Sequence, residues 1–367
     1  MRFNLALIVI LAVSISTFTL AAQEQEEPET TIRERLEVTE VLLDVVVTDS
    51  TGNIIIGLQP QDFEIKDGNR KIAAKTATFY SNRQFVQSGI SAERLGVAAD
   101  EIVSDRYFIL FFHDQRFEDP DLTANILDAI RWSKNWVRHE SLANDWIAIL
   151  SYDATLKVHQ DFTNNKEDLL RGLDSAAKSA NPGSTWPSRI EETQGASLRA
   201  NLPQGKDLRK QTRRIFSALD VVADSAGHIV GRKNLLLFSV GLGQARTNLN
   251  YTPDVRYWPP MMESLNDNNV AVYAISWVRN SALETEEQAN LSNSLSALSA
   301  DTGGRFFGNF VNFKEPLQMI NEDNNGYYLL SYDAEHPAGE TGFREVDVSV
   351  QNPDFIVRAR KGYKLGD

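Results

Sequence analysis

Three polar residues that follow a long apolar run have the side chains best suited to chemistry in this chain. The run Arg106-Tyr107-Phe108-Ile109-Leu110-Phe111-Phe112 leads directly into His113, Asp114 and Gln115. Such a run is typical of a strand buried on both faces, as in parallel sheets covered by helices. In these sheets function gathers where a strand ends and its loop begins. The candidate chemistry therefore depends on what these three side chains can do.

Proton transfer by His113 together with Asp114 would suit a hydrolase, and this is one hypothesis for the pair. The chain has five histidines, and none lies in a His-Glu-x-x-His spacing or near a Gly-x-Ser-x-Gly motif. No pair of nucleophile and base stands out elsewhere. We therefore predict that the protein is not an enzyme. The favoured interpretation of the polar residues is a hydrogen-bonded cluster that caps the sheet.

Residues 105–322 alternate between strand and helix patterns. Strands are predicted at Tyr107–Phe112, Trp146–Tyr152, Leu235–Val240 and Val270–Trp277. Three helices place apolar residues at helical spacing, namely Leu122, Ile126, Ile130 and Val137, then Ile215, Leu219 and Val222, then Leu291, Leu295 and Leu298. This alternation predicts an α/β fold with a doubly wound, mainly parallel sheet.

Both flanks of that region have β patterns. Residues 36–83 predict an N-terminal β segment, residues 84–104 a linker, and residues 323–367 a C-terminal β segment with alternating Val346, Val348 and Val350. Each β segment is too small to be stable alone. We therefore expect the two to pair into one small β-sandwich, with the α/β domain inserted between them.

The first residues have the pattern of a signal peptide. Residues 1–22 contain Arg2, an apolar stretch and a small-residue cleavage site, and residues 23–35 predict a flexible acidic leader. We expect export to the periplasm or secretion, with no transmembrane segment after cleavage. Retention of the signal as a membrane anchor is the alternative.

The composition argues against several functions. The chain has 37 Lys and Arg against 50 Asp and Glu, a net charge of −13. Cleavage after residue 22 removes Arg2 and no acid, which leaves 36 against 50, or −14. We therefore expect no nucleic-acid partner, because phosphate binding needs clustered cations, and the basic run 209–214 should be the exposed face of a helix. The absence of cysteine excludes disulfides and thiol catalysis.

Four segments resemble von Willebrand factor type A domains: Arg106–Phe112 with its polar loop, Arg232–Gly241, Asn269–Ile275 and Thr302–Phe307. The flanking motifs Leu43–Asp49, Gly57–Phe63 and Arg358–Tyr363 resemble a bacterial group of exported "VWFA-related" proteins. The similarity covers nearly all of residues 36–364, and the ordered set is more specific than any single motif. It implies a type A, Rossmann-like fold. For this group no general biochemical activity is established.

Type A domains usually hold Mg²⁺ in a metal ion-dependent adhesion site. The site consists of Asp-x-Ser-x-Ser after the first strand, a threonine on a later loop and an aspartate after the fourth strand. The resemblance places these positions at His113, Gln115, Phe117, Thr185 and Val240. Only Thr185 has suitable chemistry, so we expect a degenerate site and neither a metal nor another cofactor. The alternative is a rearranged site with Asp114, Thr185 and Ser239 as ligands. Against it, His113 and Asp114 are adjacent in a strand, and such residues point to opposite sides, so they rarely share one target.

Long loops and aromatic residues suggest a binding surface. An insertion at 186–206 follows Thr185, and residues 243–260 form a second long loop that contains Tyr257 and Trp258. Trp132 and Trp136 lie four apart on one helix, where they belong either to the core or to a partner surface. Long loops over a rigid sheet usually carry binding surfaces.

We predict an exported, non-enzymatic binding or scaffolding protein. Its loops at 113–119, 183–206 and 241–260 are expected to contact an unknown protein partner, in the cell envelope or outside the cell, without metal. The alternative is a divalent-metal-dependent adhesin.

Overall fold

The computed structural model describes residues 36–81, 105–115, 122–179, 195–243, 254–277 and 286–366. Residues from Leu36 onward form one compact unit. The predicted signal peptide and leader, residues 1–35, and the predicted linker, 84–104, lie outside the described residues. Within the described ranges, no helix combines the length and the apolar character needed to cross a membrane.

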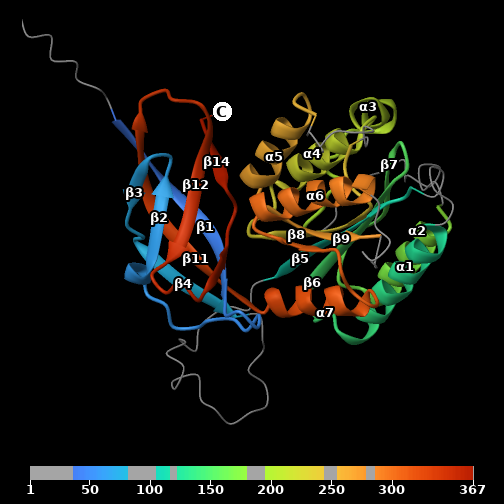
Figure 1. The fold of residues 1–367 in the computed structure, drawn as a ribbon. Helices are drawn as coiled ribbons and strands as arrows, with labels where there is room; N and C mark the ends of the chain where they lie inside the picture. Colours follow the sequence, from blue (N-terminus) through green and yellow to red (C-terminus); the bar gives the residue numbers. More distant parts are fainter. Residues whose placement is uncertain are drawn as a thin grey trace, which may run out of the picture. The chain divides into compact units, whose positions relative to one another are not determined.

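The centre of the α/β domain is a six-stranded sheet in the order β10-β9-β8-β5-β6-β7 (Figure 1). Its strands are β5 (Arg106–His113), β6 (Asp145–Tyr152), β7 (Leu156–Thr163), β8 (Lys233–Ser239), β9 (Val270–Ser276) and β10 (Arg305–Phe307). Neighbours are parallel except for β7, which pairs antiparallel with β6 at one edge. Counted from β5 as the first, the order is 3-2-1-4-5-6, a doubly wound sheet. The predicted fold class is confirmed.

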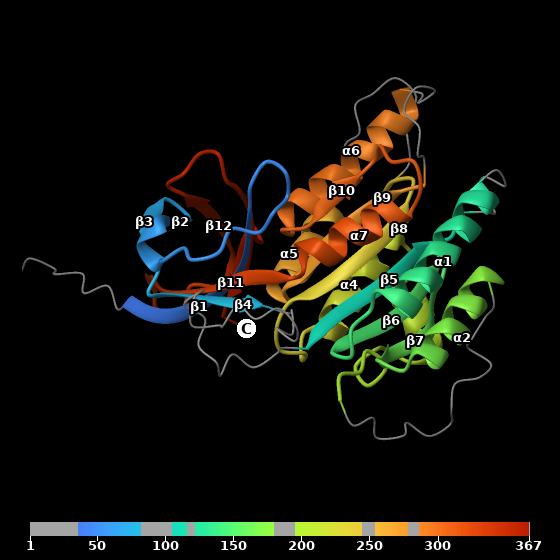
Figure 2. The same cartoon turned by 90° about the horizontal axis from the view of Figure 1, so that it is seen from below.

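Helices cover both faces of this sheet (Figures 1 and 2). One face carries α1 (Leu122–His139), α2 (Lys166–Ala177) and α7 (Lys314–Asp323), and the other α3 (Gly205–Gln211), α4 (Ile215–Ala226), α5 (Trp258–Asp267) and α6 (Glu286–Asp301). Alternate residues of β5 enter two cores. Phe108 packs on the α1 side with Ile126, while Ile109 packs on the α4 side with Leu219. Successive side chains of this buried strand thus pack alternately against the helices on the two faces of the sheet.

Two strands of the sheet were missing from the sequence prediction, namely β7 and β10. β7 follows a tight turn in which Ala154 has a φ of 102°, and β10 has only three residues. The predicted strands at Val240 and Trp277 end one residue earlier, at Ser239 and Ser276. The basic run 209–214 was expected on one helix. It instead spans the end of α3 and the turn that leads into α4, with its charged side chains exposed.

A close backbone contact fixes the entry to β10. A Cβ atom on Gly304 would lie 1.9 Å from the carbonyl oxygen of Val272 in β9. Gly304→Ala should therefore lower the free energy of unfolding by about 3 kcal/mol or more, because backbone would have to move. Gly308→Ala is the matched control, since its Cβ would meet the movable ring of Phe306. Chemical denaturation of both variants tests this, and equal losses would contradict it.

Both chain ends build a β-sandwich. One sheet has the order β13-β1-β11-β4 and the other β14-β12-β2-β3. The strands are β1 (Leu36–Thr48), β2 (Phe63–Asp67), β3 (Arg70–Ile72), β4 (Thr76–Ser81), β11 (Gly326–Pro337), β12 (Gly342–Val350), β13 (Ile356–Arg358) and β14 (Gly362–Leu365), with a short 3-10 helix at Pro60–Asp62. Antiparallel pairing of β1 with β11 and of β2 with β12 joins the N-terminal strands to the C-terminal ones. The expected composite sandwich is confirmed.

The two sheets of the sandwich share one apolar core, to which Leu43, Ile65, Tyr328 and Val346 contribute. Within the predicted N-terminal β segment, the neighbouring strands β3 and β4 lie in different sheets. Between β1 and β2, Ile54 makes only an isolated bridge with Thr48.

Polar contacts tie the sandwich to the α/β domain. Asp44 of β1 accepts a hydrogen bond from the side chain of Asn269, which precedes β9. Arg360 donates to the carbonyl oxygens of Leu42 at 2.8 Å and Asn266 at 2.7 Å. Burial lowers the pKa of Lys233, the first residue of β8, to about 8, an effect partly offset by Asp44. These contacts join β1 to the amino ends of β8 and β9.

Candidate functional site

The strand order reverses between β5 and β8, and the first candidate residues lie at this switch point. His113 ends β5 and Ser239 ends β8. His113 Nδ1 lies 2.8 Å from Ser239 Oγ, and both side chains are buried. In open α/β sheets the carboxyl edge at this point is where ligands bind. In this chain the hydrogen bond between His113 and Ser239 joins β5 to β8 at this point.

Further hydrogen bonds hold this pair in place. Ser239 Oγ donates to the carbonyl oxygen of Gly241 at 3.0 Å and accepts from the Gly241 amide at 3.1 Å. Trp277 Nε1 donates to the carbonyl oxygen of His113 at 3.0 Å. Burial lowers the pKa of His113 to about 4, an effect only partly offset by the charge of Asp114. The imidazole is therefore neutral at neutral pH.

This geometry does not support a hydrolase at His113. The Ser239 side chain is completely buried and hydrogen-bonded, so a substrate has no access to its oxygen. Asp114 Oδ2 accepts a hydrogen bond from Ser179 Oγ at 2.9 Å, at the end of α2.

Asp114 belongs to a second polar group at the same edge. Ser179 has a φ of 50°, and its carbonyl oxygen accepts from Lys157 Nζ at 3.3 Å. Lys157 also lies 2.6 Å from Asp153 Oδ2 in the turn between β6 and β7. The end of β5, the end of α2 and this turn are thereby linked through polar side chains.

Three of the expected metal-site positions are described, His113, Gln115 and Val240, and their side chains do not fit Mg²⁺. Gln115 Oε1 accepts the Val240 amide hydrogen at 3.1 Å, and Val240 has no side-chain oxygen. His113 and Ser239 bind each other, while Phe117 and Thr185 lie outside the described residues. Mg²⁺ requires nearly octahedral oxygen ligands with at least one carboxylate. No group of three or more His, Asp or Glu side chains placed to hold a metal was found among the described residues.

Sequence reasoning gave no role to His159, which the structure places near this edge. Its Nε2 lies 2.7 Å from Ser151 Oγ of β6 and its Nδ1 lies 2.8 Å from Ser175 Oγ of α2. Burial, reinforced by the charge of Lys157, lowers its pKa to about 4. The alternating pattern of residues 156–163 was the signal that could have placed His159 on a strand.

The aromatic residues that suggested a partner surface are mostly packed. Trp136 is 1% exposed in the core under α1, and Trp132 packs partly against the same core. Trp258 contacts the ring of Phe216 of α4 with a centroid distance of 6.3 Å, and Tyr257 stacks on it at 6.5 Å. These side chains therefore contribute to the core of the α/β domain.

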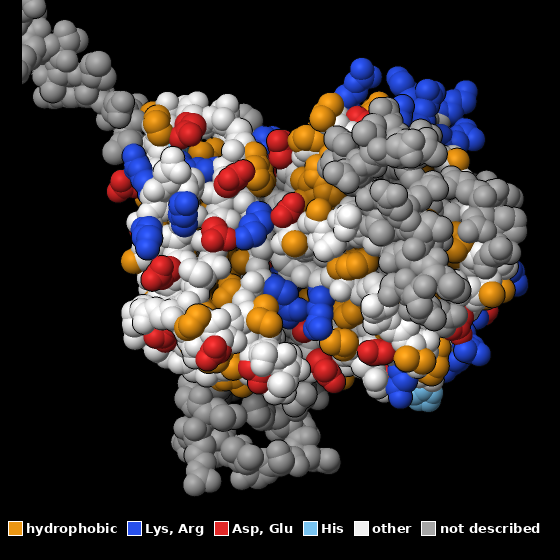
Figure 3. Space-filling model, viewed as in Figure 1, with side chains coloured by type: hydrophobic (Ala, Val, Ile, Leu, Met, Phe, Trp, Pro, Cys, Tyr) orange, Lys and Arg blue, Asp and Glu red, His pale blue; other side chains and the backbone are white. Residues whose placement is uncertain are grey.

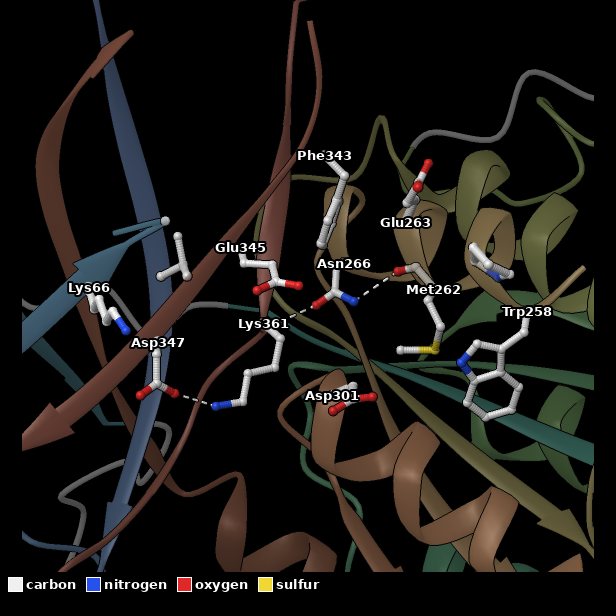
Figure 4. Close-up of a pocket in the computed structure, with 13 residues that line it drawn as sticks. Lys66, Trp258, Met262, Glu263, Asn266, Asp301, Phe343, Glu345, Asp347 and Lys361 are labelled. Atoms are coloured by element: carbon white, nitrogen blue, oxygen red, sulfur yellow. Dashed lines mark hydrogen bonds and ion pairs between the residues drawn. The ribbon is translucent and has the colours of Figure 1, made fainter. Parts of the chain in front are cut away.

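A groove of about 490 Å³ lies between α5 and the sandwich (Figure 4). Trp258, Met262 and Phe343 supply its apolar surface, and Asp301 and Glu345 supply carboxylates. Burial raises the pKa of Asp301, and the charge of Glu345 adds to the effect. Lys361 extends toward Asp347, with which it forms an ion pair (Figure 4). This groove lies along the contact that joins the two parts of the compact unit.

No protein-family model and no curated protein matches this chain. Among solved structures it is similar to BatB from Bacteroides thetaiotaomicron, with 12% identity and a TM-score of 0.37 over 60% of this chain and 97% of that one. The ArnB paralog VWA2 from Sulfolobus acidocaldarius has 9% identity and a TM-score of 0.36, over 89% of this chain and 75% of that one.

A third similar structure is proximal thread matrix protein 1 from the mussel byssus. It has 13% identity and a TM-score of 0.35 over 59% of this chain, which spans 46% of that protein's length. Another structure of the mussel protein has a zinc-occupied MIDAS motif. The α/β domain of the present chain has the von Willebrand type A arrangement, which its strand order and its single antiparallel edge strand define. The resemblance inferred from the sequence is thus confirmed at the level of the fold.

Proposed function

We propose that this chain is an exported, non-enzymatic binding protein whose type A domain contacts a protein partner without a metal ion. The surface comprises the loops 113–119 and 241–257, whose described residues 113–115 and 241–243 lie at the carboxyl edge of the sheet. Residues 195–203 of the expected loop 183–206 are not part of it, because they lie toward the amino edge, where the Leu198 amide donates to Asp161 of β7 and Asn201 contacts His228 before β8. The expected loop 241–260 ends earlier, since α5 begins at Trp258. Loops at the carboxyl edge are the usual place for binding in an open α/β sheet. The export signal predicted in residues 1–22 supports a partner in the cell envelope or outside the cell.

The observation that carries this proposal is the hydrogen bond between His113 and Ser239 at the switch point. A metal-dependent adhesion site would need free oxygen ligands at this position and a place for a partner's carboxylate. Here a neutral imidazole and a fully buried hydroxyl satisfy each other. A partner recognised at this edge would therefore contact the loops directly rather than through a cation.

Titration with Mg²⁺, Mn²⁺ or Ca²⁺ is expected to produce neither heat nor a change in melting temperature. A cation present at 100 times its dissociation constant would stabilise the folded state by about 2.7 kcal/mol, which a melting curve would detect. A metal-dependent adhesin with rearranged ligands makes the opposite prediction. In that case the protein would melt later with cation, and Asp114→Ala and Thr185→Ala would each remove the shift.

The partner can be sought by affinity capture from cell-envelope extract, in parallel with and without a chelator. The proposal predicts that the same protein is retained in both samples. Variants shortened within 244–253 should lose it, whereas Arg131→Ala on the exposed side of α1, where this side chain is 73% exposed, should retain it. Loss of the partner only with chelator would favour the metal-dependent alternative. Retention by the shortened variants would remove this loop from the binding surface.

A further inference from the structure

A cationic hollow lies beside the edge strand β10, away from the carboxyl edge described above. It has a volume of about 460 Å³, and its lining includes Arg305, Phe306, Val348, Val357, Arg358 and Ala359. Arg360 and Lys361 also belong to the lining, and the described residues around the hollow include no carboxylate. Figure 3 shows Lys and Arg side chains gathered near the middle of this face. Such a lining is unusual in a chain with a net charge of −13.

Two of these four cations have partners outside the hollow. Arg360 donates to the carbonyl oxygens of Leu42 and Asn266, and Lys361 pairs with Asp347 in the neighbouring groove (Figure 4). These contacts hold the charged groups of Arg360 and Lys361 outside the hollow, so Arg305 and Arg358 are the cations that can face a ligand there.

Arg305 and Arg358 share a single carboxylate. Arg358 Nη2 lies 2.9 Å and Arg305 Nη1 3.9 Å from the same oxygen, Oδ1 of the buried Asp323. Two positive charges facing one negative charge leave a surplus of one. In addition, Arg358 Nε and Nη2 are buried without a hydrogen-bond acceptor among the described residues, and Asp323 Oδ2 lacks a donor there. A buried donor that lacks an acceptor costs about 1–3 kcal/mol, so such groups usually mark a missing partner.

The rest of the lining is apolar. Phe306, Val348, Val357 and Ala359 form a wall next to the two guanidinium groups. A volume of this size falls in the range of small-molecule sites, which combine an apolar wall with a few polar groups. Guanidinium groups bind carboxylates and phosphates in a bidentate manner. The surplus of one charge matches a carboxylate better than a doubly charged phosphate.

We propose that this hollow binds a carboxylate carried on an apolar body, supplied by a free organic acid or by the C-terminal residue of a peptide. The carboxylate binds at Arg305 and Arg358, and the apolar body packs on Phe306, Val348 and Val357. The site is separate from the loops at the carboxyl edge, so its occupancy does not depend on the partner bound there.

Calorimetric titration of the full chain with benzoate, benzamide and acetate tests the proposal. Benzoate is expected to bind at least about tenfold more tightly than benzamide, which lacks the negative charge. It should also bind at least about tenfold more tightly than acetate, which lacks the apolar body. Arg305→Gln should weaken benzoate binding about tenfold or more. Its side chain is 34% exposed and its pairing is loose, so the variant should fold, and a melting curve checks this. Arg131→Gln on α1, which is 73% exposed, is the matched control and should leave benzoate affinity unchanged.

A tripeptide with a C-terminal phenylalanine, compared with its amide, separates the two sources. If the tripeptide with a free carboxylate binds more tightly than benzoate, the ligand is the C-terminal residue of a peptide. If it binds equally or more weakly, the ligand is a free organic acid. The proposal is overturned if benzamide binds as well as benzoate or if Arg305→Gln leaves the affinity unchanged. It is also overturned if benzoate does not bind up to about 10 mM.

Discussion

Asp67→Ala is expected to lower the free energy of unfolding by about 3–5 kcal/mol. Asp67 ends β2 and is completely buried in the sandwich. Its Oδ2 accepts hydrogen bonds from Tyr332 at 3.0 Å and Tyr363 at 2.8 Å, and Arg344 Nε lies 2.5 Å from its Oδ1. Because the four residues come from both sheets, the carboxylate joins the two layers.

The loss of stability arises because Asp67→Ala would leave Arg344 and two tyrosine hydroxyls without their present partner. Arg344 would lose its closest anion, since Glu340 lies 3.6 Å away and is partly exposed. The two tyrosine hydroxyls would lose their acceptor in a site where burial, with the nearby charge of Asp67, already raises their pKa. Unpaired buried groups of this kind are more costly than the loss of a surface contact.

Asp347→Ala is the matched control on the neighbouring strand β12. Asp347 forms an exposed ion pair with Lys361, and such pairs contribute about 0–1 kcal/mol. Urea denaturation of both variants measures the difference. If Asp67→Ala lost no more stability than Asp347→Ala, the proposed joining role of Asp67 would be wrong.

Stability should fall as the pH is lowered from about 6.5 to about 4 because of His113 and His159. Burial holds the pKa of each near 4, against 6.5 for an exposed histidine. Between these values the unfolded chain binds more protons than the folded one, so the free energy of unfolding decreases with falling pH. The stabilisation that each buried neutral histidine contributes is fully present above the pKa of the unfolded chain and is lost as the pH falls to the folded pKa. Each histidine should cost about 2 kcal/mol between pH 7.5 and pH 5.

Single variants separate this effect from that of carboxylates. Asp220 and Asp301, whose pKa values burial raises, change stability in the opposite direction but are present in every variant. His159→Gln and His113→Asn keep a polar side chain and remove the titration. Each should have a smaller loss between pH 7.5 and pH 5 than the unchanged chain, by about 2 kcal/mol. Parallel pH profiles for a variant and the unchanged chain would show that the histidine is not responsible.

The sequence predicted the fold because its signals are local and repeated. Unbroken apolar runs mark strands that are buried on both faces, as for β5, and helical spacing marks the buried sides of α1 and α4. The strand β7 gave a weaker signal because it lies at the edge and alternates polar with apolar residues. The three residues of β10 are too few for any periodic pattern.

The site was only partly predictable, since its contacts join residues that are far apart in the chain. The sequence identified His113, but its hydrogen bond with Ser239 spans 126 positions. Asp67 followed by Gly68 has the pattern of a turn, whereas its partners Tyr332 and Tyr363 lie 265 and 296 positions away. The identity of such partners depends on which strands become neighbours, and that is decided by the tertiary fold.

The central claim is that the carboxyl edge of the type A domain binds its partner without a cation. Anomalous diffraction at the manganese absorption edge, from crystals grown with Mn²⁺, tests it most directly. The account predicts no manganese peak within about 2.6 Å of the side-chain oxygens of Asp114, Thr185 and Ser239. A peak bound to two or more of these oxygens would contradict it.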